Sequence, residues 1–322
     1  MSLDLDKQKR NRRLNRSNEL TDVRKISFVD EVRRNKGLYL MLIPFFAVFF
    51  LMTILPILVS TGLSFTYYNM FQAPQWRGLL NYVNLFMNDE VFYIALKNTL
   101  LFAFLTGPLS YLLCFMFAWL VNELGRGLRV LLTFMFYAPS ISSSVYFIWQ
   151  FLFSGDSYGL INGVLMNIGI LQEPIQWFSD PQYNLWILML VQLWMSLGTG
   201  FLAFISGFQC VDRSLYEAGA IDGIKSRFHE LIYITIPMVK PQLIFGAIMQ
   251  ISTSFAVSTI SMQLCGYPST NYSAHTLVLH IMDHGTTRYE MGYACAISVV
   301  LFVLVLLFKQ LVDIVMKYVG DS

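Results

Sequence analysis

Six long stretches of the chain contain no charged side chain, and each is long enough to cross a lipid bilayer as a helix. A spanning helix needs about 20 mostly apolar residues, and a helix satisfies its own backbone hydrogen bonds in lipid. The charge-free stretches cover residues 37–76, 98–122, 130–155, 181–211, 241–282 and 291–308. The pattern therefore predicts an all-α membrane protein with six spanning helices, at about 38–63, 98–121, 129–153, 184–209, 241–264 and 291–316.

A seventh charge-free stretch, residues 157–172, is too short to span and contains glycines and asparagines. We expect it to be a loop that carries at most a surface helix.

The composition supports a membrane protein. Of the 322 residues, 56% are hydrophobic and 13% are charged, whereas soluble domains are roughly 25% charged. These values exclude a disordered chain and a disulfide-stapled secreted domain, and they disfavour an ordinary soluble enzyme. A large soluble protein with buried core helices is the alternative, but six such stretches in one chain fit it poorly.

Lysine and arginine are concentrated on one side of the predicted membrane. Eleven of the 22 lie in residues 1–36, and the loops 123–129 and 210–240 and the C-terminal tail bring the total to 19. The other side carries only Arg77, Lys97 and Arg288. Because cytoplasmic segments carry the excess of these residues, we expect both termini to be cytoplasmic.

These assignments divide the chain into three parts. Residues 1–36 form a basic cytoplasmic segment of net charge +5, which anionic membrane lipid would attract; a specific docking arm is the alternative. Apolar spacing within residues 26–32 indicates a short interfacial helix there. Residues 37–317 form the transmembrane domain, and residues 318–322 form a short cytoplasmic tail.

The sequence contains none of the common catalytic patterns. A phosphate-binding loop, a paired-histidine zinc motif and a nucleophile elbow are all missing, and the four cysteines have no metal-ligand or disulfide spacing. We therefore expect no catalytic residue, no metal and no cofactor bound by this chain, and no nucleic-acid partner. No predicted span carries a charge near its middle, which disfavours proton-coupled or ion-coupled carriers. A neutral, hydroxyl-rich cargo fits such spans, with energy supplied elsewhere.

The segment between the fourth and fifth predicted spans has a strong local pattern. It reads Tyr-Glu-Ala-Gly-Ala-Ile-Asp-Gly over residues 216–223 and reaches Pro237 before the next span. Two short apolar faces are separated near Gly223, where glycine permits a sharp turn. The pattern predicts a helix–turn–helix held outside the bilayer for a partner protein; an amphipathic helix lying on lipid is the alternative.

This segment resembles the EAA loop of permease subunits in ATP-binding-cassette importers. Glu217, Ala218, Gly223 and Pro237 match that pattern. Gly219 stands where the pattern has a third alanine, and the interval from glycine to proline is one residue longer than usual. The additional residue would rotate the second short helix by about 100°, unless the turn absorbs it.

The resemblance extends over residues 37–316. Asn81-Tyr82, Tyr137-Ala138-Pro139-Ser140, Trp177 to Pro181 and Gly292-Tyr293-Ala294 are similar to segments of carbohydrate-type permeases. It implies the six-helix fold of a type I importer in a prokaryotic plasma membrane. The implied partners are a second permease subunit in a heterodimer, two ATPase subunits that use ATP and Mg²⁺, and an extracellular solute-binding protein. The residues expected to couple this chain to the ATPase are Glu217, Ala218, Gly219, Asp222, Gly223 and Pro237.

Polar side chains mark a candidate cargo pathway. Gln192, Ser196 and Thr199 lie at i, i+4 and i+7, which is one stripe of a helix. Packing between helices is the competing explanation, since hydroxyls and amides bond across spans. The larger permease subunit of the maltose importer is similar here, and its positions matching Gln192, Ser196, Thr199, Thr253 and Met249 face the sugar. We add Tyr137 and Ser140 of the third span to the pathway candidates.

The sequence thus predicts a non-enzymatic permease that forms half of the pathway for a sugar or oligosaccharide. A permease for a polyol or a glycerophosphodiester is the alternative within the class. A secondary transporter that works without an ATPase, or a membrane scaffold that transports nothing, would belong to a different class.

Overall fold

The computed structural model describes residues 35–142 and 145–320, without the side chains of Thr199 and of residues 315–320. Contacts divide the chain into two compact units, Met1–Val59 and Ser60–Ser322. The predicted short helix at 26–32 and nearly all of the basic segment lie outside the described residues.

An apolar helix makes up the described part of the first unit and continues into the second. It consists of α3 (Lys36–Phe49), the π-helical turn η1 (Phe50–Ile54) and α4 (Leu55–Leu63), which form one stretch of 28 residues. Its apolar side chains are exposed from Leu38 to Val59, as expected of a helix that faces lipid or a partner. A helix is thus observed where one was expected at 38–63, whereas its crossing of a membrane stays a prediction.

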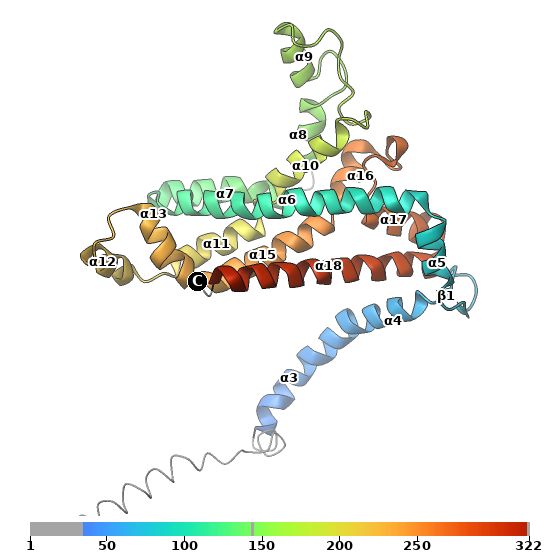
Figure 1. Ribbon diagram of the computed structural model, residues 1–322, viewed down its shortest axis with the longest axis horizontal. Coiled ribbons are helices and arrows are strands. Elements are labelled where there is room, and N and C mark those ends of the chain that lie inside the picture. Colours follow the sequence, from blue (N-terminus) through green and yellow to red (C-terminus); the bar gives the residue numbers. More distant parts are fainter. Residues whose placement is uncertain (1–34, 143–144, 321–322) are drawn as a thin grey trace, which may run out of the picture. The chain divides into compact units, whose positions relative to one another are not determined.

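The second unit is built around long helices that run side by side. Figure 1 shows α6, α7, α11, α15 and α18 together in one bundle. The main helices are α6 (Glu90–Asn122), α7 (Arg126–Ile141), α8 (Val145–Leu152), α10 (Asn184–Met195), α11 (Thr199–Gln209), α15 (Lys240–Phe255), α16 (Thr259–Cys265) and α18 (Met291–Gly320).

Aromatic and small residues pack the bundle at the junction of α6, α11 and α15. Phe204 of α11 is buried, and Phe115 of α6 meets it edge to face with ring centroids 5.8 Å apart. Gly246 of α15 lies so close that an added Cβ would be 2.5 Å from the Phe204 ring. A small residue at this position therefore lets the two helix backbones approach, as is common between membrane helices.

The two ends of the bundle carry different elements. At one end lie α12 (Arg213–Ile221), α13 (Arg227–Glu230), the π-helical turn η2 (Leu231–Thr235) and α14 (Ile236–Met238). We call this the α12 end and the opposite one the α17 end (Figure 1). The α17 end carries the two-stranded antiparallel sheet β1 (Thr66–Tyr67) and β2 (Gln75–Trp76), α5 (Leu80–Met87), η3 (Thr270–Tyr272), α17 (Leu277–Met282) and the π-helical turn η4 (Asp283–Thr287).

The segment between α8 and α10 folds around one buried asparagine. Its helix α9 (Leu160–Asn167) confirms a helix within the predicted loop 157–172. The amide of Asn162 donates to the carbonyls of Ser154, Asp156 and Ile175. Its oxygen accepts from the Trp177 indole at 2.9 Å, so one side chain ties the segment together.

Three of the predicted spans are interrupted in the structure. The span expected at 129–153 breaks after Ile141 and bends by 87°. The span expected at 184–209 breaks between Met195 and Thr199, and the one expected at 241–264 breaks between Phe255 and Thr259. Within the described residues, four helices are long and apolar enough to cross a membrane, or up to six if two bent pairs each count as one span.

Candidate functional site

The three helix breaks meet at one cavity of about 380 Å³. We call it the broken-helix cavity. It is lined by residues from α7, α8, α10, α15, α16 and the breaks: Tyr137, Ser140, Tyr146, Gln192, Met195, Ser196, Gly198, Met249, Gln250, Thr253, Ala256, Val257, Ser258, Thr259 and Ile260. Six of the seven predicted pathway residues are in this set. The seventh, Thr199, begins α11, and its side chain lies outside the description. That these side chains contact cargo stays a prediction.

A close contact at the second break explains why glycine is needed there. A Cβ added to Gly198 would lie 2.6 Å from the Cβ of Ser140. On the other side of the break, the Ser196 carbonyl accepts hydrogen bonds from the Gln250 amide at 3.2 Å and from the Cys114 thiol of α6 at 3.3 Å. The interrupted backbone is thus held by packing on α7 and by a side-chain bond from α15. Membrane proteins tolerate non-helical backbone where it lines a cavity or is buried in protein.

The polar groups that face the cavity are uncharged, and several keep hydrogen-bonding capacity. The hydroxyls of Ser140 and Ser196 donate to carbonyls of their own helices, each at 2.7 Å, and Thr253 does so at 3.1 Å. Their oxygens can still accept. The amide of Gln192, which is 8% exposed, has no hydrogen-bond partner among the described residues. Together with the rings of two tyrosines, this lining suits a neutral ligand rich in hydroxyl groups.

Sequence reasoning did not assign Gln250, Tyr146 or Ser258 to the pathway, although all three line the cavity. The available signal was the presence of polar side chains in the third and fifth expected spans. Their spacing could not show where the helices break, and the breaks determine which side chains reach the cavity.

The segment at the α12 end has the predicted helix–turn–helix form. Asp212 caps α12 by accepting a hydrogen bond from the Ser214 N–H at 3.0 Å. After α12, Gly223 has φ +95°, and the N–H of Ile224 reaches back to the Gly219 carbonyl at 2.9 Å. This is a glycine-terminated helix end in which the six-to-one bond satisfies a free carbonyl. The turn expected at Gly223 is confirmed.

Both departures from the EAA pattern have a structural explanation. Gly219 is buried, and an added Cβ would lie 2.7 Å from Cδ1 of Ile234, so a larger neighbour fills the space of the missing methyl group. The interval from Gly223 to Pro237, which is one residue longer than usual, contains the π-helical turn η2. Since the hydrogen bonds of a π-helical turn enclose one residue more than those of an α-helical turn, η2 offers a way to accommodate the additional residue.

The two short helices of this segment are held against each other while their outer face stays exposed. The Tyr216 hydroxyl is 2.9 Å from that of Thr235. Glu217, Ala218 and Asp222 are exposed, as is Pro237 within α14. Ile221 is 86% and Phe228 is 59% exposed. Exposed apolar side chains beside a carboxylate are the features of a docking surface for a partner protein.

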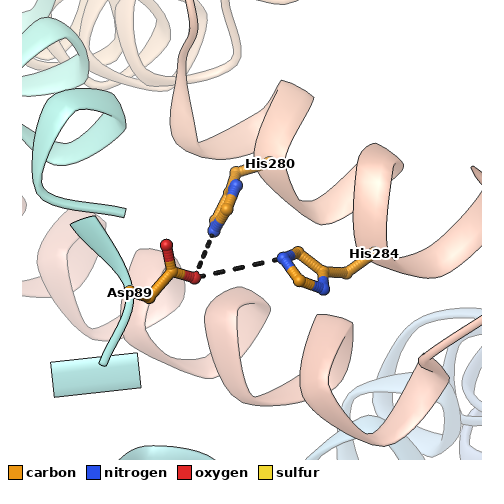
Figure 2. Close-up of side chains that lie close together, drawn as sticks. All are labelled: Asp89, His280 and His284. Carbon is orange, nitrogen blue, oxygen red and sulfur yellow. Dashed lines mark hydrogen bonds and ion pairs between the residues drawn. The ribbon is translucent and has the colours of Figure 1, made fainter. Parts of the chain in front are cut away.

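A second cavity, of about 440 Å³, lies at the α17 end. Figure 2 shows His280 of α17 and His284 of η4 pointing toward Asp89, which precedes α6. Nε2 of His280 is 2.9 Å from Oδ2 of Asp89, and Nε2 of His284 is 4.0 Å from the same oxygen. Spacing along the chain could not indicate this group, because Asp89 and His280 are 191 positions apart.

Burial and hydrogen bonds set the charge of this cluster. Burial alone would raise the pKa of Asp89, but bonds from His280, the Phe92 N–H and Tyr293 outweigh it and hold the pKa well below its usual range. Burial lowers the pKa of His284, against the bond to Glu290. Burial also lowers the pKa of His275, whose ring is next to that of His280, to about 4. At neutral pH Asp89 is therefore ionised, while His275 and His284 are neutral.

The fold, the uncharged cavity at helix breaks and the exposed helix–turn–helix define a membrane permease. Residues 110–320 match the family model of the binding-protein-dependent transport system inner membrane component, and the chain belongs to this family. It is a family of transport components, not of enzymes.

Known relatives agree with this assignment. The chain is 32% identical to the probable ABC transporter permease protein YesP of Bacillus subtilis over 273 residues, covering 83% of this chain and 86% of the relative. It is also 32% identical to the lactose transport system permease protein LacF of Rhizobium radiobacter, covering 84% and 92%. The crystal structure of a bacterial alginate ABC transporter, in complex with a periplasmic protein that holds an alginate pentasaccharide, has the same fold. Its TM-score is 0.73 at 21% identity, over 92% of this chain and 99% of that one.

Proposed function

We propose that this chain is one of two permease subunits of an ATP-driven importer, and that it forms half of the pathway for a neutral sugar or oligosaccharide. The observation that carries the proposal is the broken-helix cavity. Three helices stop at the same place, and the fifteen side chains and backbone positions around the opening include no charged residue.

The chemistry of the lining favours a sugar over the alternatives. Hydroxyl and amide groups can pair with sugar hydroxyls, and Tyr137 and Tyr146 offer ring faces for stacking. A glycerophosphodiester would bring a negative charge for which this subunit supplies no cationic partner. The relative named for lactose transport supports the sugar assignment, as does the uncharged character of the spans.

Energy would enter through the α12 end. Glu217, Ile221 and Phe228 form an exposed surface there, and an ATPase subunit with a basic, partly apolar cleft would fit it. An exposed ion pair at Glu217 alone would contribute about 0–1 kcal/mol. Burial of Ile221 and Phe228, at about 25 cal/mol per Å², would therefore supply more of the binding energy.

The distribution of lysine and arginine gives the orientation. It supports an orientation in which the α12 end and both termini would be cytoplasmic and the α17 end and α9 would lie outside; the membrane would be the plasma membrane of a prokaryote. An extracellular solute-binding protein would then deliver cargo at the α17 end.

The test is a reconstituted complex with the second permease and the ATPases in lipid nanodiscs. Hydrolysis is measured with the binding protein loaded in turn with neutral di- and trisaccharides, a polyol and a glycerophosphodiester. We expect a neutral saccharide to stimulate hydrolysis most. A chain that retains no ATPase and takes up cargo on a proton gradient would contradict the proposal.

A further inference from the structure

Three potential metal ligands converge at the α17 end, in a cluster that the proposed function does not use. Suitable ligand atoms of Asp89, His280 and His284 all lie within 4.8 Å of one another. Two ligands bound to Zn²⁺ at about 2.1 Å in a tetrahedral site are about 3.4 Å apart. The distances from Asp89 Oδ2 to the two histidine nitrogens, 2.9 and 4.0 Å, lie on either side of that value. Shifts of roughly half an ångström would correct these two distances. The ligand atoms of the two histidines lie within 4.8 Å of each other, so they would have to approach by up to about 1.4 Å.

We propose that Asp89, His280 and His284 bind one divalent transition-metal ion, with Zn²⁺ the expected kind. Two imidazole nitrogens and one carboxylate oxygen suit zinc and its neighbours, whereas Mg²⁺ and Ca²⁺ prefer sites made of oxygen ligands only. Three protein ligands leave a fourth position for water. All three residues line the cavity of about 440 Å³, so water and the ion can reach that position.

Neighbouring groups already orient two of the ligands. Nδ1 of His284 is 2.8 Å from the Glu290 carboxylate, and this carboxylate–histidine arrangement is what holds metal-binding histidines in other proteins. The Tyr293 hydroxyl donates to Asp89 Oδ2 at 2.8 Å, while the Phe92 N–H donates to Asp89 Oδ1 at 2.9 Å. The carboxylate is therefore fixed from both sides and keeps Oδ2 directed at the histidines.

The surroundings of His280 are compatible with a ligand role. It is 1% exposed, and its Nδ1 has no hydrogen-bond partner among the described residues. A hydrogen bond to Asp89 uses only Nε2, so a buried nitrogen is left unpaired whichever tautomer forms. Metal binding at Nε2 would place the proton on Nδ1 and leave no additional group unpaired. Nδ1 is unpaired with or without a metal, so its burial does not oppose a ligand role for Nε2.

The bound ion would connect segments that are distant in sequence. Asp89 begins α6, whereas His280 and His284 lie on the segment that leads into α18. The metal would therefore hold the first turn of α6 against the α17–α18 junction at the mouth of the second cavity.

Metal binding is tested on the full-length chain in nanodiscs, purified on a tag without histidine and stripped with a chelator. Co²⁺ is the probe, because it gives visible absorption bands in tetrahedral nitrogen and oxygen sites, and Zn²⁺ is then added as competitor. We expect one Co²⁺ per chain, displacement by Zn²⁺, and a higher unfolding temperature with Zn²⁺ than without it.

Variants identify the ligands. His284→Gln and Asp89→Asn should each weaken Co²⁺ binding at least about tenfold, and Glu290→Gln should weaken it by about 10- to 100-fold. Asparagine still caps a helix, so Asp89→Asn keeps the start of α6, and unfolding of the metal-free variants shows whether they fold. His229→Gln, in the exposed α13, is the matched control and should bind like the wild type. Less than about one-fifth of an equivalent of Co²⁺ bound by the wild type, or equal binding by His284→Gln and Asp89→Asn, would overturn the proposal in favour of a hydrogen-bonded cluster.

Discussion

Replacement of Gly223 by alanine should weaken docking of the ATPase, although it adds only one methyl group to the turn that links α12 and α13. Gly223 has φ +95°, and nothing lies within 4 Å of an added Cβ. The cost of a side chain there is therefore backbone strain and not collision. An L-residue in a left-handed conformation costs about 1–2 kcal/mol.

That strain acts on the relative positions of the two short helices. The turn sets the positions of α12 and α13, which carry the exposed Glu217 and Phe228. If only the strained turn is competent to dock, 1–2 kcal/mol lowers its population, and with it the apparent affinity, by up to about 5- to 30-fold. Asparagine tolerates positive φ better than alanine, so affinity should fall in the order Gly223, Gly223→Asn, Gly223→Ala.

The assay is titration of the purified ATPase subunit onto permease heterodimers in nanodiscs. Gly127→Ala is the matched control: Gly127 lies in α7, near the α12 end, with open space around it and no positive φ. That change should leave affinity intact. Equal affinity of Gly223→Ala and the wild type, with normal stimulation of hydrolysis by cargo, would refute the reasoning that the turn geometry matters for coupling.

Three further predictions concern cargo, folding and orientation. Loss of one hydrogen bond to a neutral sugar costs about 0.5–1.5 kcal/mol. Gln192→Ala and Thr253→Ala should therefore each lower uptake by about 2- to 10-fold while the ATPase still co-purifies. Unchanged uptake in both variants would mean that these residues serve helix packing only. Asn162→Ala leaves three carbonyls, the Ile175 N–H and an indole N–H without their partner, at about 1–3 kcal/mol for each group left buried. It should make the α8–α10 segment the first site of protease cleavage; wild-type resistance would show that water replaces the amide. In a chain whose four native cysteines are replaced, an impermeant reagent applied to intact cells should label cysteine at position 76 and not at position 225, and the opposite result would reverse the orientation.

The apolar pattern predicted the helices well because length and lack of charge are properties of single segments. The helix expected at 38–63 is observed at 36–63, and the one expected at 98–121 lies inside α6. The early start of α6 follows from Asp89, whose side chain caps the helix well before the apolar stretch begins. The search for charge-free stretches excluded this first part of α6 because it contains Glu90 and Lys97. A helix can continue beyond the apolar stretch that crosses the membrane.

The breaks were not predictable in the same way. Ala256, Val257 and Ser258 are as apolar as many helical triplets, yet they separate α15 from α16. Here the buried hydroxyl of Thr276, from a distant segment, donates to the Val257 carbonyl, so tertiary contacts satisfy the backbone that the helix gives up. Local sequence cannot report a partner 19 residues away. The Asp89 cluster was missed for the same reason.

One helix connects the two sites that the sequence did identify. The coupling segment ends at α14, and after Val239 the chain enters α15, whose later residues Gln250 and Thr253 face the broken-helix cavity. At 1.5 Å per residue, the 16 residues of α15 form a rod of about 24 Å. Gly246 of α15 packs directly on the Phe204 ring of α11, so we expect α15 and α11 to move together, and α11 begins at the break lined by Ser196. A displacement imposed at the α12 end would therefore reach two of the three helix breaks together.

Strain at Gly223 and loss of the Gln192 amide perturb opposite ends of this path. Only the change at Gly223 should therefore alter ATPase binding, whereas both changes should reduce the stimulation of hydrolysis by cargo.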